Sequence, residues 1–328
     1  MAPRVGPATM VSRSAGAWRT DAEHPGSTPA APRCTPAAST VPGSSHSADY
    51  HCRMPQPPAP HQAPHPRPGS PTENGTASPL GNLRDLGGIP VSNGRVQPGL
   101  LWRADDPTLS PPAELQALAG QGLSALLDLR STPEVSASPH RTAAELGITH
   151  HHLPLAESAV HPLALVKAAP SMQSPADVGR WYAGLVRSHL GEVVSGLRVI
   201  GSTDGGVMFH CAAGKDRTGI LAAVVLAVLG AERSVIIEDY AATEQNMHAV
   251  IPRLRVAAYA QSADGPEDER SKEAADFFAS NHPLLSATAD SMDSMLTDLG
   301  GEPGLMDLIS SVADPDTVVG GLHKKLVN

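Results

Sequence analysis

The sequence is poor in aromatic residues, in charge and in lysine. Of its 328 residues, 3% are aromatic and 17% are charged, and 5 Lys stand against 19 Arg. No run approaches the roughly 18–20 apolar residues of a membrane-spanning helix; the longest candidate, Ile220–Leu229, fits a buried helix. Three cysteines, two of them in a proline-rich segment, exclude a disulfide scaffold. The scarcity of Lys beside abundant Ala favours a GC-rich coding sequence of bacterial origin.

The chain divides into two parts of different composition. Residues 1–79 hold 16 of the 32 prolines and contain no Lys, Phe, Leu or Ile, so we predict a disordered Pro/Ala/Ser-rich arm. Residues 80–328 hold nearly all the residues for a core and form one predicted domain. This domain carries a net charge of −11, whereas the arm carries +2. An acidic domain excludes the basic surface that nucleic acids require.

The beginning of the sequence has no apolar stretch after Arg4, so we expect no secretory signal peptide. We therefore expect a cytoplasmic protein, with secretion without a recognisable signal as the alternative. Composition leaves the oligomeric state open.

Strands alternate with helices from Leu80 onward. The expected strands are Leu100–Arg103, Leu123–Leu129, Ile148–Leu153 and Val207–Phe209. Expected helices are Pro111–Leu118, Arg141–Leu146, a single long helix over Ala176–Ile200, and Thr218–Leu229, with only helices after Arg233. This order predicts an α/β fold with a central, mostly parallel sheet flanked by helices and a helical C-terminal region.

The segment His210–Gly219, HCAAGKDRTG, connects a predicted strand to a predicted helix. Cys211 lies six positions before Arg217, and Thr218 follows, which is the Cys-x5-Arg-Thr pattern of cysteine-dependent phosphatases. A loop of this length can point its backbone N–H groups inward and, with the helix N-terminus, bind a phosphate. The positive field of such a loop favours the Cys211 thiolate, which can attack phosphorus and form a phosphocysteine.

The other loop residues have supporting roles in this hypothesis. Arg217 holds two phosphate oxygens, Thr218 donates to the sulfur, and His210 orients the loop. The small residues leave room for the phosphate, and the substrate-binding set is His210, Ala212, Ala213, Gly214, Lys215 and Thr218. A nucleotide-binding Walker loop is excluded because Phe209 occupies its required glycine position. One Cys beside one His also lacks a second ligand pair for zinc, so we expect no metal and no cofactor.

On these residues the sequence resembles the bacterial tyrosine phosphatase family whose loop reads HCxxGKDRTG. The resemblance extends over most of residues 80–328. The matching segments are NLRDLGG at 82–88, LLWRA at 100–104, LDLRS at 127–131 together with Glu134, and IEDY at 237–240. It implies a tyrosine-phosphatase-like fold and hydrolysis of phosphotyrosine, often also of phosphoserine or phosphothreonine. Lys215 resembles a lysine of lipid phosphatases and implies a third positive group, which keeps phosphoinositides as alternative substrates.

The general acid is left open by the sequence. The leaving oxygen needs a proton, and a carboxylic acid near the loop should supply it. Asp216 lies inside the loop, and Asp128 ends a strand at the edge where parallel strands form sites. Asp85 is a third candidate.

Two further features have competing interpretations. His150 and His152 are expected on one face of a strand, where they are either a metal-binding pair or ordinary strand histidines. Arg84 and Asp85 either form a salt bridge with each other or contact the substrate. The family resemblance also implies a mobile helical lid near residues 263–273, where our match is poor. Two other classes stay open beside the enzyme: a non-catalytic phosphate-binding adaptor, and a rhodanese-type sulfur transferase.

Overall fold

The structure is a computed structural model, and it describes residues 79–328 except 158, 161 and 262–275. The described residues all belong to the second of the two units into which the chain divides, His65–Asn328. The arm predicted for residues 1–79 lies outside the described residues apart from Pro79.

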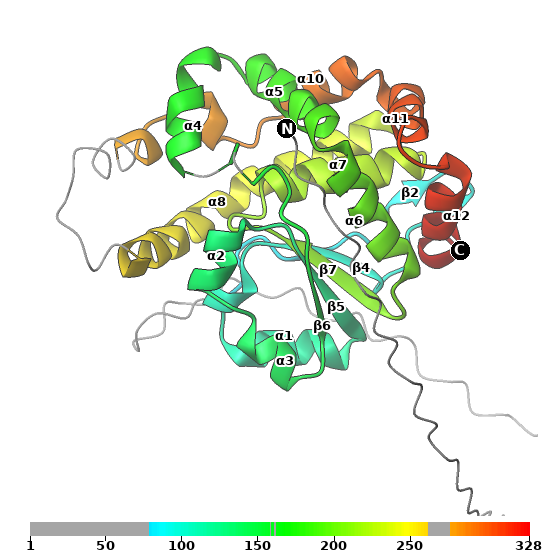
Figure 1. The fold of residues 1–328 in the computed structure, drawn as a ribbon, viewed down its shortest axis with the longest axis horizontal. Helices are drawn as coiled ribbons and strands as arrows, with labels where there is room; N and C mark the ends of the chain where they lie inside the picture. The colour runs from blue at the N-terminus through cyan, green and yellow to red at the C-terminus, as the bar shows by residue number, and fades with distance from the viewer. Residues whose placement is uncertain (1–78, 158, 161, 262–275) are drawn as a thin grey trace, which may run out of the picture. The chain divides into compact units, whose positions relative to one another are not determined.

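A five-stranded sheet forms the centre of the second unit (Figure 1). Its order is β1 (Arg84–Asp85), β4 (Leu101–Ala104), β7 (Gly206–His210), β5 (Leu123–Asp128) and β6 (Thr149–His152). Only β1 pairs antiparallel; the other four strands are parallel. The four strands expected from the sequence are therefore confirmed, and so is the mostly parallel sheet.

Helices cover both faces of the sheet. On one face, α1 (Pro112–Gly120) and α3 (Arg141–Glu145) bury Leu115, Leu118 and Ala143 against Trp102, Leu126 and Met208. On the other face, α7 (Asp216–Val228) is buried along almost its whole length. Its Ile, Leu, Val and Ala side chains contact the sheet on one side and further helices on the other, which explains why the helix is apolar all round.

The remaining elements complete the helical layers (Figure 1). They are a small hairpin of β2 (Pro90–Val91) and β3 (Gly94–Arg95), the short helices η1 (Pro107–Leu109), α2 (Thr132–Ala137), α4 (Pro162–Ala168), η2 (Ala169–Ser171) and η3 (Pro283–Leu285), and the helices α5 (Pro175–Ser188), α6 (Leu190–Ser202), α8 (Arg233–Gln261), α10 (Ala289–Leu299), α11 (Gly301–Ser310) and α12 (Pro315–Leu326). In the part of the chain that the structure describes, no helix is both long and apolar enough to span a bilayer.

The prediction of a single helix over Ala176–Ile200 is wrong. The chain forms two helices that meet at His189, whose backbone leaves the helical region at φ −122° and ψ 33°. The two helices have different partners, because α5 packs on α10 and α6 packs on α12. A straight helix could not follow both partners, and the continuous apolar periodicity of the sequence does not record the change of direction.

The contact between α5 and α10 depends on the absence of a side chain at Gly179. A Cβ atom there would lie 2.2 Å from Ser291 O and 2.6 Å from Ser294 Cβ, whereas a Cβ at Gly184 of the same helix would meet nothing within 4 Å. Gly179→Ala should lower the free energy of unfolding by about 1–3 kcal/mol through overpacking. Gly184→Ala should raise it by up to about 1 kcal/mol through helix propensity. Urea denaturation of both variants tests this, and equal effects at the two glycines would contradict it.

Candidate active site

Three parallel strands deliver the predicted loop to the middle of the sheet edge. Ala104 of β4 and Asp128 of β5 both lie opposite His210, the last residue of β7. Cys211 therefore emerges at the carboxyl edge of the sheet, between the segments that follow β4 and β5. Its side chain is buried, with 2% of its surface exposed. The loop runs from Cys211 to Lys215, and α7 begins at Asp216.

The carbonyl groups of this loop are hydrogen-bonded on its outer side. The carbonyls of the three central residues accept from neighbouring segments, namely from a backbone N–H after β4, a buried asparagine before β1, and a buried arginine on β4. The bonds join Asp106 N to Ala212 O (3.1 Å), Asn82 Nδ2 to Ala213 O (3.3 Å) and Gly214 O (2.9 Å), and Arg103 Nη2 to Gly214 O (2.9 Å).

The amide groups of the loop are left for a ligand. Among the described residues none accepts a hydrogen bond from the N–H of Ala212, Ala213, Gly214 or Lys215. Gly214 has a left-handed backbone with φ +68°, and a Cβ there would lie 2.6 Å from Ala104 O. Only glycine fits this position, and the resulting turn produces the concave row of N–H groups that binds anions.

Arg217 is fixed at the first turn of α7 by a carboxylate. Its Nη1 and Nη2 donate to the two oxygens of Glu134 at 2.7 and 2.9 Å, and Nη1 also donates to Leu129 O at 3.3 Å. Burial acts to lower the pKa of Arg217, but these hydrogen bonds outweigh it and raise that pKa above its ordinary value. A guanidinium has five N–H donors, so the Nε–H and one Nη2–H are left. These two form a second fork that can hold two phosphate oxygens.

Glu134 has two roles that link Arg217 to the start of α2. Its Oε2 accepts from Ser131 N at 2.7 Å, and Ser131 Oγ accepts from Glu134 N at 3.4 Å, which is a capping box. Burial acts to raise the pKa of Glu134, but the hydrogen bonds and charge of Arg217 lower it to about 2. The carboxylate is therefore ionised throughout the neutral range and orients Arg217 before any substrate arrives.

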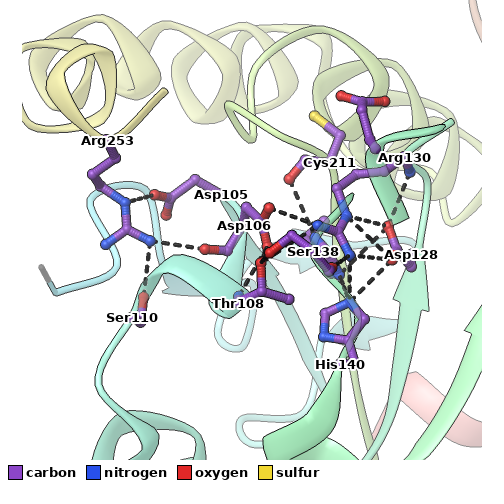
Figure 2. A network of polar contacts seen from close by, with 12 residues as sticks. Asp105, Asp106, Thr108, Ser110, Asp128, Arg130, Ser138, His140, Cys211 and Arg253 are labelled. Atoms are coloured by element: carbon purple, nitrogen blue, oxygen red, sulfur yellow. Dashed lines mark hydrogen bonds and ion pairs between the residues drawn. The ribbon is translucent and has the colours of Figure 1, made fainter. Parts of the chain in front are cut away.

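Asp128 is the centre of a buried polar network (Figure 2). Its oxygens accept from Arg130 Nε and Nη2, and the Nε2 atoms of His140 and His150 lie 3.0 and 3.2 Å from its Oδ2. Burial acts to raise the pKa of Asp128, but the surrounding His210, His140, His150 and Arg130 lower it far below the ordinary value. Arg130 continues the network to Asp106 Oδ2 at 2.6 Å, and the carbonyl of Ser138 accepts from it at 3.1 Å.

His210 supports the loop as expected from the sequence. Its Nδ1 lies 3.2 Å from Cys211 O, and because a carbonyl only accepts, Nδ1 carries a proton. Burial lowers the pKa of His210 to about 4, so the ring is neutral at neutral pH. The neutral ring holds the strand-to-loop junction without adding charge beneath Cys211.

One group of buried side chains has the spacing of a metal site. Ligand atoms of Asp128, His140 and His210 all lie within 4.8 Å of one another. However, Arg130 Nη2 lies 2.8 Å from Asp128 Oδ2 and 3.1 Å from His140 Nε2, so a guanidinium already supplies the positive charge. A divalent ion would meet this charge at close range, so the group does not fit a metal. His150 and His152 lie on one face of β6 as expected, with their ring centroids 6.3 Å apart. Their Nε2 atoms have different partners, because that of His150 lies near Asp128 Oδ2 and that of His152 near Arg130 O.

Lys215 and Asp216 form an ion pair at the end of the loop. Lys215 Nζ donates to Asp216 Oδ1 and to Leu284 O, both at 2.8 Å, and its side chain is 3% exposed. Tyr182 OH donates to the same Asp216 Oδ1 at 2.5 Å. The ammonium expected to add a third positive group for the phosphate is thus bonded to oxygens of the helical region.

Two expectations differ from the structure. The Thr218 hydroxyl is buried and has no hydrogen-bond partner within the described ranges, so the expected bond to the Cys211 sulfur is not formed. Arg84 does not pair with Asp85: its Nε donates to Asp239 Oδ1 at 2.7 Å, and Asp85 accepts from backbone N–H groups of Gly87 and Gly99. Adjacent residues on a strand point to opposite faces, which excludes the expected pair.

Sequence reasoning missed most of the residues that hold the loop. Asn82, Arg103 and Glu134 lie in the segments quoted for the resemblance, but no role was assigned to them. Tyr182 lies within the helix expected over Ala176–Ile200, and no role was assigned to it either. A polar or charged residue inside an otherwise buried strand, such as Arg103 in LLWRA, is the signal that could have identified one of them.

The loop places Cys211 six residues before an arginine that is held by a carboxylate, and this arrangement is typical of cysteine-dependent phosphatases. Comparison with known proteins agrees with this resemblance, because the sequence model of the "Tyrosine phosphatase family" matches residues 77–307. The chain belongs to the tyrosine phosphatase family, and the mixed α/β fold expected from the resemblance is confirmed.

Three curated relatives match parts of the chain. A Cupriavidus necator protein, provisionally named a tyrosine-protein phosphatase, is 33% identical over 172 residues, 51% of this chain and 61% of its own length. The tyrosine-protein phosphatase of Nostoc commune is 32% identical over 132 residues, 39% and 43% of the two chains. The triple specificity protein phosphatase PtpB of Mycobacterium tuberculosis is 27% identical over 199 residues, 53% and 69%. The matches thus span less than two thirds of the first two relatives.

The Glu134–Arg217 pair can be tested by a neutral replacement. Glu134→Gln keeps a residue that is compatible with the capping box but removes the charge facing Arg217. Hydrolysis of an aryl phosphate should fall about 10–100-fold in kcat/KM, because misplacing a substrate-binding group costs about that much. The matched control is Glu157→Gln, which should keep full activity. Glu157 has an exposed carboxylate that accepts from Thr132 N, in the same first turn of α2 that contains Glu134. Equal activities of the two variants would contradict the positioning of Arg217 by Glu134.

Proposed function

We propose that the chain is a protein-tyrosine phosphatase that hydrolyses phosphotyrosine on proteins, with phosphoserine or phosphothreonine as further substrates. The observation that carries the proposal is the loop from Cys211 to Lys215. Its carbonyls at Ala212, Ala213 and Gly214 are bonded outward, and its amides from Ala212 to Lys215 have no acceptor among the described residues. Arg217 adds a second fork, its Nε–H and one Nη2–H, which have no acceptor among the described residues. A phosphate monoester bound there would place its phosphorus above the Cys211 sulfur.

The reaction proceeds in two displacements. The Cys211 thiolate attacks phosphorus, the bond to the tyrosine oxygen breaks, and that oxygen takes a proton from a carboxylic acid. A water then attacks the phosphocysteine, returns a proton to the same carboxylate, and the S–P bond breaks to release phosphate and thiolate. Backbone N–H groups and Arg217 stabilise the charge on the equatorial oxygens in both steps. No metal or cofactor enters these steps.

Asp216 is the better of the two candidate acids. Asp128 is fully buried, and its lowered pKa leaves it without a proton to donate at neutral pH. Asp216 lies next to Arg217 with 18% of its side chain exposed and one oxygen, Oδ2, free of hydrogen bonds within the described residues. It can therefore reach a leaving group and exchange protons with water.

Phosphoinositides stay a second substrate class in this proposal. The residue that favoured them is Lys215, whose ammonium donates to the carbonyls of Leu284 and Ser286. This arrangement favours a single phosphate over a multiply phosphorylated ring. A panel of phosphotyrosine and phosphothreonine peptides and inositol lipids distinguishes the classes. No observation favours the phosphate-binding adaptor or the sulfur transferase. The cytoplasmic location stays a prediction from the sequence.

The nucleophile is tested with Cys211→Ser. This variant should lose all measurable turnover of phosphotyrosine peptides, because a serine hydroxyl lacks a thiolate to attack phosphorus. It should still bind inorganic phosphate or tungstate, measured as a rise in melting temperature, because the amides and Arg217 are unchanged. Retained turnover, or turnover that requires an added divalent metal, would falsify the mechanism.

The general acid is tested by comparing Asp216→Asn with Asp128→Asn. Asp216→Asn should lower kcat for phenyl phosphate about 10²–10⁴-fold and remove the limb of the pH–rate profile that reports the acid. Asp128→Asn should instead lower stability, since it leaves Arg130 buried without its main carboxylate. Loss of that limb in Asp128→Asn alone would reverse the assignment, and its retention in both variants would point to a third acid.

A further inference from the structure

Two buried tyrosines lie behind the proposed general acid, and the catalytic scheme above does not use them. Tyr182 comes from the middle of α5 and Tyr240 from α8, and both side chains are almost fully buried. Their hydroxyl oxygens are 2.9 Å apart, and Tyr182 OH also donates to Asp216 Oδ1 at 2.5 Å. Tyr182 is the one of the two whose hydroxyl contacts the proposed catalytic carboxyl, which makes it a candidate for controlling where the proton of Asp216 resides.

The protons of this group can be assigned. A tyrosine has one hydroxyl proton, and a carboxylate is a stronger acceptor than another hydroxyl, so the Tyr182 proton belongs to Asp216. The Tyr182 oxygen is then an acceptor, and Tyr240 OH at 2.9 Å and Lys215 Nζ at 3.4 Å are its donors. Burial and the neighbouring Asp216 raise the pKa of Tyr182 well above 10, so this hydroxyl keeps its proton.

The two oxygens of Asp216 consequently have different surroundings. Oδ1 accepts from Tyr182 OH and from Lys215 Nζ, at 2.5 and 2.8 Å. Oδ2 has no hydrogen bond to any residue that the structure describes. A proton on Oδ1 would compete with two donors already in place, whereas a proton on Oδ2 meets no such conflict. The arrangement thus favours the transferable proton on Oδ2.

The position of Tyr182 is set by packing on two sides. Gly179, one turn earlier in α5, lets the helix backbone approach α10 closely enough that a Cβ would lie 2.2 Å from Ser291 O. Tyr240 packs against Gly219 of α7, where a Cβ would lie 2.8 Å from the ring. The two rings meet edge to face with their centroids 6.1 Å apart. Neither hydroxyl can move away from the loop without repacking these helices.

We propose that Tyr182 is a positioning residue for the general acid: its hydroxyl fixes Asp216 through Oδ1 and presents Oδ2 to the leaving oxygen of the substrate. The inference rests on the proposed phosphatase function and adds a residue to it. The charged and titratable groups around Asp216 are Lys215, Arg217 and Cys211 from the loop and its helix, Tyr182 from α5, and Tyr240 and Glu244 from α8. Among the partners of Oδ1, Tyr182 is the neutral one, so its removal leaves the local charge unchanged.

Tyr182→Phe tests the proposal, with Tyr240→Phe as the matched control. Each variant loses one buried hydroxyl, but only the first loses the bond to Asp216. For phenyl phosphate, whose leaving group needs a proton, Tyr182→Phe should lower kcat about 10–100-fold with an unchanged KM. For an ester of a strongly acidic phenol, such as 2,4-dinitrophenyl phosphate, the loss should stay below about threefold. Tyr240→Phe should change neither substrate by more than about threefold.

The pH–rate profile provides a readout that a purely structural residue would not move. Removing a donor from a carboxylate favours its protonated form, so the alkaline limb for phenyl phosphate should shift to higher pH in Tyr182→Phe. In an Asp216→Asn background, Tyr182→Phe should cause no further loss, because residues that act as one unit are not additive.

The possible outcomes separate the inference from the function beneath it. Equal losses on both esters, from misfolding or general loosening of the loop, would overturn the positioning role, and so would an unmoved pH profile or additive losses with Asp216→Asn. Turnover that survives Cys211→Ser would instead overturn the phosphatase mechanism itself. A leaving-group-dependent loss that vanishes in Asp216→Asn supports both.

Discussion

The loop between β7 and α7 can bind an anion because its carbonyl groups are already hydrogen-bonded on the opposite side. A peptide group places its C=O and N–H in opposite directions, so fixing the carbonyls of Ala212 and Gly214 outward turns successive amides inward. The donors are a backbone N–H, Asn82 and Arg103, which come from segments more than a hundred residues earlier. The site therefore exists only in the assembled sheet, and much of the polar structure around it serves to hold these donors.

The buried and half-buried arginines around the loop are each paired with a carboxylate. Asp239 forms ion pairs with both Arg84 and Arg103, and Glu134 forms one with Arg217. Arg130 forms ion pairs with Asp106 and Asp128. Burying an unpaired guanidinium would cost several kcal/mol, so these pairs are a condition for placing rigid donors in the interior. The four arginines and the four carboxylates Asp106, Asp128, Glu134 and Asp239 balance in charge. The net charge of −11 of residues 80–328 therefore comes from other residues of the domain.

The strands and the loop could be predicted from the sequence because their signals are local. Residues 207–219 show a buried strand, a small-residue turn with Gly214 and an apolar helix in uninterrupted order. The partners of that loop could not be predicted in the same way, since Glu134 meets Arg217 across 83 positions and Tyr182 meets Asp216 across 34. The break at His189 was missed for the same reason: α5 and α6 follow different neighbouring helices, and apolar spacing reports burial without reporting direction.

Lys215 shows how the same residue type can serve a different purpose once the tertiary partners are known. In the sequence it stands beside the phosphate loop as a further cation, yet its ammonium joins Asp216 to the carbonyls of Leu284 and Ser286. Burial acts to lower the pKa of Lys215, but Asp216 outweighs it and keeps the ammonium charged. This fixed charge and the Tyr182 hydroxyl both bind Oδ1. The loop lysine thus acts on the proposed acid, and Arg217 with the backbone amides is left to recognise the phosphate.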